Sequence, residues 1–379
     1  MIIPLRNQVK WLYYPLFLAV NDMSRFERQT ILKGFGNEGQ SRLQSAKVLV
    51  VGAGGLGCPA LLYLAAAGIG TLGIADGDRV SLSNLNRQVL FGIADVGQSK
   101  AIRAGAILTE KYGDLTVKVH DYFLDSHNII DTLSDYDLVL DATDNFSTRY
   151  LLNDACVLLG KPLVSGAIYQ HEGQFALLNI PLSGSYSCNY RDLYPSPPQA
   201  SEVPNCAETG VIGVLPGIIG TMQASETIKY LSGCFHIQPN LLYLYRLLDH
   251  TLIKVSIQPN PIALTLIPAN ITELQNRDYV WDCRLLSDIS WQEAIHLWQE
   301  TPDTVVFLDV RQLDEMPLLE GYPVIRLPLN QLAEIAMDAY DTILVFCQAG
   351  KRSRQAVLVL QENHPQKIIY AIEGGIKAY

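Results

Sequence analysis

The sequence predicts an α/β protein, in which a mostly parallel sheet covered by helices is followed by a second, smaller α/β unit. The first observation is the stretch KVLVVGAGGLG from residue 47, in which an apolar strand runs into a glycine turn. The second is the Ala- and Leu-rich helix CPALLYLAAAG that follows, with another apolar strand, TLGIAD, after it. This order of strand, helix and strand is typical of parallel sheets. The third is a similar alternation that begins again near residue 287.

The remaining elements of the first unit follow in order. After a helix that begins near VGQSK we expect strands at LTVKVH, YDLVLDA, KPLVSGAI and GQFALLNI. One helix is expected between the first two strands, and a second, LNDACVLLG, between YDLVLDA and KPLVSGAI. Residues 181–204 are rich in Ser, Pro and Tyr and lack periodicity, which predicts a long loop. A helix near GIIGTMQASETIKYL and strands at LLYLYRL and TLIKVSI complete this unit.

The second unit is predicted from the strands TVVFLDV, TILVFC and KIIYAIEGG and the helix RSRQAVLVLQEN. A proline-containing stretch separates the two units. We therefore expect an N-terminal tail over residues 1–23, a first domain over 24–258, a linker over 259–286 and a second domain over 287–379. The length of 379 residues also favours two domains over one.

Composition limits the partners and the compartment. The chain has 28 Lys and Arg against 38 Asp and Glu, a formal charge of -10, which argues against nucleic acid or an anionic membrane as the main partner. Seven widely spread cysteines, at positions 58, 156, 188, 206, 234, 283 and 347, form no small disulfide framework. We therefore expect a reducing compartment.

The glycine turn predicts a phosphate site. Gly52, Gly54 and Gly57 have G-x-G-x-x-G spacing after a strand and at a helix start, where free N–H groups and the helix dipole favour phosphate. Asp76 ends the next strand, where a carboxylate can bind a ribose hydroxyl. Taken alone, these features favour a dinucleotide oxidoreductase, and a turn needed only for close packing is the structural alternative.

Charged residues downstream change this interpretation. Arg87 in NLNRQ and Lys100 in VGQSK suit a triphosphate better than a nicotinamide dinucleotide. Asp144 in DATDN, at the carboxyl end of a strand, is a candidate Mg²⁺ ligand. Each has a structural alternative: Arg87 and Lys100 as solvated surface charges, and Asp144 as a helix N-cap. Their joint occurrence favours the triphosphate.

Residues 24–257 resemble the MoeB/ThiF-type adenylyltransferases, which have a Rossmann-like sheet and activate ubiquitin-like sulfur-carrier proteins. The matching stretches are RFERQTILKGFGNEGQ, VGAGGLGCPALLYLAAAGIG, DGDRVSLSNLNRQ, VGQSK, DATDN, PLVSGAI and CAETGVIGVLPGIIG. The resemblance implies Mg²⁺ at Asp144, a homodimer in which Arg28 reaches the partner's triphosphate, and an ATP site. The residues expected in that site are Gly52, Gly54, Gly55, Gly57, Asp76, Asn84, Arg87, Gln88, Lys100, Asp144, Asn145 and, from the partner, Arg28.

The resemblance also implies a reaction. The carrier's C-terminal Gly-Gly carboxylate attacks the α-phosphorus of ATP while Mg²⁺, Arg87 and Lys100 stabilise the phosphate charge. Cys206 in PNCAETG matches a family cysteine that captures the acyl group or resolves a disulfide. A small buried thiol is the structural alternative for Cys206.

One feature departs from the family. Many members hold a structural zinc with two C-x-x-C pairs, the first in a stretch like CYRCLFP. Here NYRDLYP has Asn189 and Asp192, and the stretch PNPIALTLI has no cysteine for the second pair. A structural zinc is therefore not expected, and packing or partner contacts should hold the segment instead.

The stretch CQAGKRS places Cys347 at the end of a strand, where successive N–H groups converge and Lys351 and Arg352 add positive charge. Both effects lower a thiol pKa. The stretch resembles the C-x-x-G-x-R loop of rhodanese-type sulfurtransferases, and FLDVR and EGGIKAY match that domain's other signatures over residues 287–379. A retained but inactive rhodanese-like domain is the alternative.

Together the two resemblances imply one function. The first domain adenylates the carrier, and Cys347 as a persulfide delivers sulfur through an acyl disulfide that Cys206 cleaves. A cysteine desulfurase is the expected sulfur donor. Whether the carrier serves molybdopterin, thiamine, tRNA thiolation, protein modification or cysteine synthesis stays open. The rival functions are a non-catalytic carrier-binding scaffold and an NAD-dependent oxidoreductase with a thiol-sensing domain.

The N-terminal stretch MIIPLRNQVKWLYYPLFLAVNDMS has basic residues before an apolar run, as a signal peptide has. The run is too short for a transmembrane helix. Because the implied chemistry needs ATP and free thiols, we expect a cytoplasmic protein with a flexible or mis-started N-terminus and Met23 as its natural start.

Overall fold

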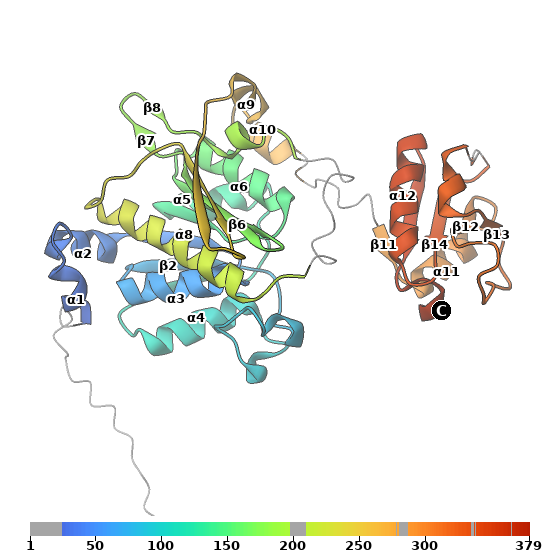
Figure 1. Cartoon of the computed structure of the whole chain (residues 1–379), viewed down its shortest axis with the longest axis horizontal. Helices are drawn as coiled ribbons and strands as arrows, with labels where there is room; N and C mark the ends of the chain where they lie inside the picture. The colour runs from blue at the N-terminus through green and yellow to red at the C-terminus, as the bar shows by residue number, and fades with distance from the viewer. Residues whose placement is uncertain are drawn as a thin grey trace, which may run out of the picture.

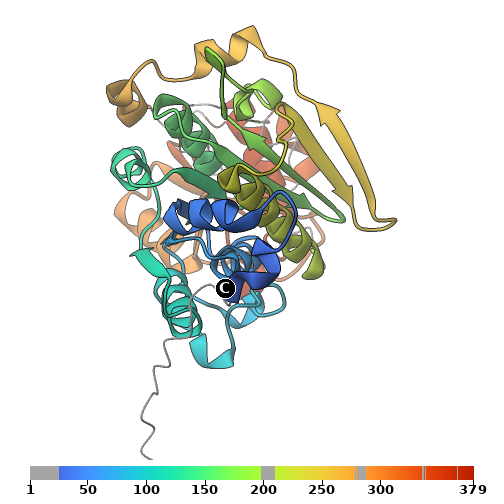
Figure 2. The same ribbon diagram turned by 90° about the vertical axis from the view of Figure 1, so that its left-hand side faces the viewer.

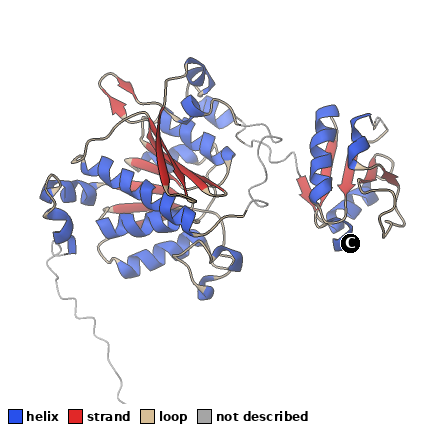
Figure 3. Ribbon diagram, in the orientation of Figure 1, coloured by secondary structure: helices blue, strands red, loops and turns tan. Residues whose placement is uncertain are grey.

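The computed structural model describes residues 25–197, 210–277, 279, 287–334, 337, 339–364 and 366–379. They form an eight-stranded sheet and a separate five-stranded sheet, each with helices, and a small two-stranded hairpin. Red strands flanked by blue helices in Figure 3 mark both sheets. The predicted α/β fold class is confirmed, with a larger, mostly parallel sheet and a smaller parallel one.

The larger sheet has the strand order β10-β9-β6-β5-β4-β1-β2-β3. The strands from β5 to β3 in that order run parallel, and β6, β9 and β10 add an antiparallel edge. Figure 2 shows the β9–β10 hairpin, in yellow, at one end of this sheet. The strands are β1 (Lys47–Val51), β2 (Thr71–Ala75), β3 (Thr116–His120), β4 (Leu138–Asp141), β5 (Leu163–Tyr169), β6 (Glu172–Leu178), β9 (Leu241–Arg246) and β10 (Thr251–Ser256).

Helices cover both faces of the larger sheet (Figure 1). Alternate residues of the buried strand β1 show why: Val48 and Val50 join one apolar cluster, and Leu49 and Val51 join another. The first cluster takes in α2 (Gly36–Ser45), α3 (Gly57–Ala67), α4 (Lys100–Lys111) and α8 (Val214–Ser232), and the second takes in α5 (Ile129–Ser134) and α6 (Phe146–Leu158). A short helix, α1 (Glu27–Thr30), precedes α2.

Two stretches predicted as loop or linker contain regular structure. The predicted loop over 181–204 holds a hairpin, β7 (Pro181–Leu182) and β8 (Ser185–Tyr186), and a helix, α7 (Tyr190–Leu193), while residues 198–204 lie outside the described residues. The predicted linker holds α9 (Pro261–Leu266) and α10 (Ile271–Asn276), each capped by an asparagine side chain. Leu274 of α10 is buried in the second apolar cluster, so the chain packs on the larger unit at least that far.

The smaller sheet has the order β11-β15-β14-β12-β13 and is parallel throughout. Its elements are β11 (Ser287–Ile289), α11 (Trp291–Glu300), β12 (Val305–Asp309), β13 (Val324–Arg326), β14 (Thr342–Phe346), α12 (Lys351–Asn363) and β15 (Ile368–Ile372). It has apolar clusters of its own. The sequence predicted β12, β14, α12 and β15, whereas β11 and β13 are only three residues long and gave no clear signal.

None of the helices in the described part of the chain is long and apolar enough to cross a membrane. The tail over residues 1–23 lies outside the described residues. The described cysteines, at positions 58, 156, 188, 234 and 347, are all free thiols.

Candidate active sites

A cavity of about 950 Å³ opens at the carboxyl ends of β1, β2 and β4. This edge collects side chains from the segments that follow three neighbouring strands of the sheet, because parallel strands end together. Among the residues predicted to bind ATP, the cavity is lined by Gly52, Gly54, Gly55, Asp76, Arg87, Gln88, Lys100, Asp144 and Asn145. It continues over β5, β6 and β9, past Tyr169, Gln174 and Tyr245.

The glycine turn has the backbone that only glycine allows. Gly52 has a φ of +95°. A Cβ on Gly57 would lie 1.8 Å from the carbonyl oxygen of Gly52, so any larger residue would push the turn away from α3. The turn therefore leaves the N-terminal end of α3, with its free N–H groups, facing the cavity.

Asp76 is tied to the turn by its own carboxylate. It accepts hydrogen bonds from the backbone N–H of Ala53 at 2.7 Å and of Asp78 at 2.8 Å. Burial raises the pKa of Asp76, and these two bonds and the charge of Lys100 oppose the rise. Each oxygen keeps a lone pair for a further donor in the cavity.

Two cations face the same space. Lys100 is buried at the first turn of α4, and its Nζ lies 2.8 Å from Oδ2 of Asp78. Arg87 donates to the carbonyl oxygen of Ser83 and to Oδ1 of Asn86, both at 3.1 Å. Gln88 is 3% exposed, and its Oε1 has no hydrogen-bond partner within the described ranges.

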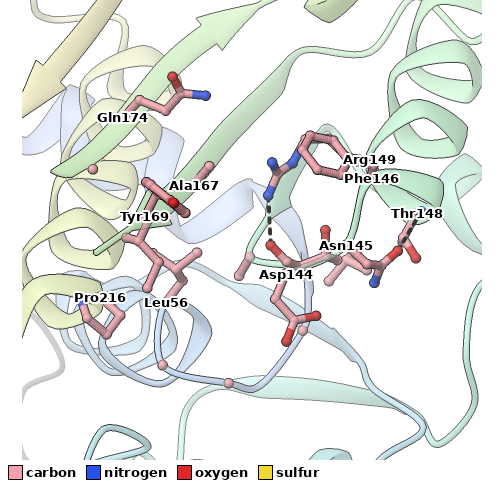
Figure 4. Close-up of a pocket in the computed structure, with 18 of the residues that line it drawn as sticks. Leu56, Asp144, Asn145, Phe146, Thr148, Arg149, Ala167, Tyr169, Gln174 and Pro216 are labelled. Atoms are coloured by element: carbon pink, nitrogen blue, oxygen red, sulfur yellow. Dashed lines mark hydrogen bonds between the residues drawn. The ribbon is translucent and has the colours of Figure 1, made fainter. Parts of the chain in front are cut away.

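Asp144 and Asn145 follow β4. Figure 4 shows them across the cavity from Leu56 and Pro216. Asp144 is exposed. Its structural alternative, the N-cap of the next helix, is wrong, because Asn145 caps α6 by accepting from the N–H of Thr148 at 2.8 Å. The Asp144 carboxylate is therefore not used as a cap.

A buried ion pair beneath this loop was not predicted from the sequence. Arg149 of α6 lies 3.1 Å from Asp141 and also donates to the carbonyl oxygens of Thr143 at 2.9 Å and Gly166 at 3.2 Å. The pair joins β4, β5 and the loop that carries Asp144. The spacing of Arg149 after DATDN was the only available signal for it.

Three of the predicted ATP-site residues, Gly57, Asn84 and Arg28, do not line this cavity, and Gly57 begins α3. Asn84 accepts from the N–H of Ser81 at 3.1 Å and so shapes the turn before Arg87. Arg28 is exposed on α1 and is not part of the cavity wall of its own chain. Cys206 lies outside the described residues.

Hydrogen bonds hold the segment around Asn189 and Asp192, which the family resemblance compares with a zinc-binding stretch. Asp192 accepts from the N–H of Asn189 at 2.7 Å and from its Nδ2 at 2.9 Å, and it also accepts from the N–H of Asn260, the cap of α9, at 2.7 Å. These residues do not fit a tetrahedral thiolate site, because the carboxylate is already engaged by three N–H donors. This network joins α7 to α9.

A second buried network lies beside it. Both oxygens of Asp154, which is fully buried, accept from Arg191 at 2.7 Å, and Oδ2 also accepts from the hydroxyl of Tyr279 at 2.7 Å. Arg191 in turn donates to the carbonyl oxygen of Pro195 at 2.9 Å. The network fixes α7 and the segment after it, whose Tyr190 and Tyr194 line the cavity.

The smaller unit holds Cys347 directly after β14, and the side chain is almost completely buried. Burial opposes ionisation, but the backbone N–H groups of Ser353, Ala349 and Arg352 and the hydroxyl of Ser353 outweigh it and lower the pKa of the Cys347 thiol. The Ser353 Oγ lies 3.7 Å from the sulfur and donates to the carbonyl oxygen of Gly350. Converging N–H groups thus favour a sulfur anion, as the sequence predicted.

Charged side chains surround the Cys347 loop. Arg352 forms a forked ion pair with Glu315, with one bond of 2.7 Å. Arg311 is buried against Asp309 and donates to Oε1 of Gln348 within the loop at 3.2 Å. The FLDVR signature thus supports the active loop from the neighbouring strand end.

Comparisons with known proteins agree with this geometry. A model of the ThiF family matches residues 26–261. A protein of Mycobacterium tuberculosis named as a probable adenylyltransferase/sulfurtransferase, MoeZ, is 37% identical over 377 residues, 96% of this chain and 94% of its own. A sulfur carrier protein adenylyltransferase of Thermus thermophilus is 48% identical over 241 residues, 63% of this chain and 89% of its own. The MOCS3 adenylyltransferase and sulfurtransferase of Aedes aegypti is 36% identical over 90% of this chain and 82% of its own.

Among solved structures, Escherichia coli MccB in a crystal with ATP matches with a TM-score of 0.55 and 20% identity, over 62% of this chain and 72% of its own. At that identity the likeness shows the fold alone. The MoeZ and MOCS3 relatives show more, since they cover both units of the chain. The chain belongs to the ThiF family, as an enzyme that joins an adenylyltransferase to a sulfurtransferase.

Proposed function

We propose that this chain uses ATP to adenylate the C-terminal Gly-Gly carboxylate of a ubiquitin-like sulfur-carrier protein, and that a persulfide on Cys347 then supplies sulfur for a thiocarboxylate. The observation that supports this most is the cavity, which gathers the glycine turn, Asp76, Arg87, Lys100 and Asp144 around one space. The names of the similar relatives support the same pair of reactions. We assign the adenylation to the larger unit and the sulfur transfer to the smaller one.

The cavity supplies what a triphosphate needs. N–H groups at the start of α3 and the side chains of Arg87 and Lys100 are donors for phosphate oxygens. The ion pair of Lys100 with Asp78 aims the ammonium group before ATP arrives. Asp76 can accept a ribose hydroxyl without releasing its two backbone partners.

Asp144 fits a magnesium ion bound together with a nucleotide. Mg²⁺ in such sites takes one or two carboxylates and completes its shell with phosphate oxygens and water. The exposed carboxylate of Asp144, on the cavity wall and not used as a cap, meets that requirement. The ion would supply positive charge to the triphosphate.

The proposed steps balance as follows. A carboxylate oxygen of the carrier attacks the α-phosphorus, and pyrophosphate leaves with the bonding electrons, which gives an acyl-adenylate. The outer sulfur of the Cys347 persulfide attacks the acyl carbon, AMP leaves, and an acyl disulfide joins carrier and enzyme. A thiolate, which we propose is Cys206, attacks the Cys347 sulfur, so the thiocarboxylate leaves and an enzyme disulfide forms. A thiol reductant then restores both cysteines, and a cysteine desulfurase reloads the persulfide.

We further propose that two copies of the chain complete each ATP site. Arg28 is exposed on α1 and away from its own cavity. The apolar side chains of Ile31 and Leu32, next to it, are 69% and 54% exposed, as suits a contact between copies. Arg28 of one copy would then reach the triphosphate bound to the other.

The test is ATP–pyrophosphate exchange by the purified chain, with and without each Gly-Gly-ended carrier encoded in the same genome. We expect exchange that depends on one carrier. Cys347→Ala should keep that exchange and abolish thiocarboxylate formation, measured by mass spectrometry of the carrier. ATP binding without exchange for any carrier would support a scaffold instead. Equal loss of both activities in Cys347→Ala would contradict the division of labour.

A further inference from the structure

The turn that follows β15 lies against the Cys347 loop. Gly374 and Gly375 have φ values of +68° and +57°, which turn the chain back under the loop. The N–H of Ile376 then donates to the carbonyl oxygen of Cys347 at 2.8 Å, and the N–H of Lys377 donates to that of Gln348 at 3.3 Å. Two successive carbonyl groups of the active loop are therefore anchored on one turn.

The contact leaves no room for a side chain at Gly375. A Cβ there would lie 2.3 Å from the carbonyl oxygen of Cys347 and 2.7 Å from the nitrogen of Ala349. Any such atom would push directly on the peptide group between Gln348 and Ala349. The second glycine of the EGGIKAY stretch, Gly375, is thus required because any side chain there would collide with the Cys347 loop.

Trp291 of α11 holds this turn from the other side. Its indole N–H donates to the carbonyl oxygen of Gly375 at 2.8 Å. The ring is buried and packs against Phe307, Phe346 and Tyr379, so the direction of the N–H group is fixed. The fixed indole therefore holds the turn at Gly375 in place beneath the Cys347 loop.

The orientation of the loop amides follows from this anchor. In a planar trans peptide the C=O and N–H groups point to opposite sides. When the carbonyl group of Gln348 points to Lys377, the N–H group of Ala349 in the same peptide must point the other way. Cys347 begins the same loop, and this N–H group is one of those that lower the pKa of its thiol.

We propose that Trp291 and Gly375 are positioning residues for sulfur transfer: through the turn over 374–377 they aim the Ala349 N–H group at the sulfur anion of Cys347. The inference rests on the proposed function of Cys347. Neither residue contacts the reacting sulfur itself. Both act on it through the peptide groups that follow Cys347, as a hydrogen bond to a charged group requires a fixed donor.

The helix offers a matched pair of variants. Trp291→Phe keeps the aromatic packing and removes the N–H group that holds Gly375. Trp298→Phe, on the same helix, removes an indole N–H group that has no hydrogen-bond partner within the described ranges. Gly375→Ala is the direct steric test, and Trp291→Phe keeps the proposal testable if that chain does not fold.

The experiment measures the rate of alkylation of Cys347 by iodoacetamide against pH in the full chain, with the modified peptide quantified by mass spectrometry. We expect Trp291→Phe to raise the midpoint of the profile by about one pH unit, because a donor to an anion is weakened, which slows alkylation about tenfold below the midpoint. Trp298→Phe should keep the wild-type profile. The thermal unfolding of each variant shows whether the unit is folded.

A folded Trp291→Phe chain with the wild-type midpoint would overturn the proposal, and so would an equal shift in Trp298→Phe. Alkylation requires neither ATP nor a carrier, so its outcome is independent of the exchange assay. If exchange and thiocarboxylate formation fail while the midpoint shifts as expected, the proposed function is wrong and the positioning of Cys347 stands.

Discussion

Replacing Asp154 by asparagine should destabilise the larger unit strongly. The carboxylate is fully buried, and it accepts two bonds of 2.7 Å from Arg191 and one from Tyr279. Asn is similar in shape but turns one acceptor into a donor that faces the guanidinium group, and it leaves a buried positive charge unpaired. Loss of one partner of a buried pair costs about 3–5 kcal/mol. For a unit of this size that lowers Tm by about 6–20 °C.

Differential scanning calorimetry of the full chain measures this shift. The matched control is Asp249→Asn, which breaks an exposed ion pair with Arg246 and should leave Tm unchanged. The double variant Asp154→Leu with Arg191→Met should recover part of the loss, because it removes the unpaired Arg191 charge, while Tyr279 and Arg277 still lose a partner. An Asp154→Asn chain that melts within about 2 °C of the wild type would refute the reasoning from burial.

Three further outcomes are expected. Lys100→Ala should slow carrier-dependent pyrophosphate exchange by about 10²–10³-fold, as loss of one stabilising donor does. Exchange at the wild-type rate would contradict a role of Lys100 in binding the triphosphate. A mixture of Arg28→Ala and Lys100→Ala chains should regain exchange that neither has alone, since one hybrid site is intact, and no recovery after subunit exchange would contradict the shared site. Arg352 lowers the pKa of Glu315 from an ordinary 4.5 to about 2. The ionised carboxylate therefore stabilises the folded unit above pH 4.5, and this stabilisation is lost as the pH falls towards 2. The free energy of unfolding in urea should therefore differ less between wild type and Glu315→Gln as the pH falls from 4.5 towards 2. A difference that stays constant over this range would contradict a stabilising ion pair between Glu315 and Arg352.

The residues around the predicted ATP site could be found from the sequence because their positions follow from strand ends. Gly52 and Asp76 come directly after a strand of the parallel sheet and Asp144 comes three residues after one, and parallel order brings such strand ends to one edge. Arg87 and Lys100 were placed there by their motifs. Predicting that they line one cavity did not depend on contacts between residues far apart in the sequence.

The networks that support the site could not be found in this way. Asp154 meets Arg191 and Tyr279, which are far away in sequence, and Gly375 meets a loop that begins at Cys347. Such pairings depend on which helices pack together, and single-sequence periodicity does not determine this. The predicted linker is a similar case: its prolines suggested a connection between the two units, but the stretch forms two helices capped by asparagine and buries Leu274.

The hydrogen-bonded junction at Asp192 has a consequence for how the chain responds to its surroundings. Where a metal ion joins two segments, the stabilisation rises and falls with the logarithm of the free ion concentration. The bonds from Asn189 and Asn260 to Asp192 form between groups of the chain itself. The stability of this junction therefore does not depend on a bound metal ion, and a chelator should not weaken it. The wall of the cavity formed by Tyr190 and Tyr194 should thus hold its place through changes in cellular metal supply.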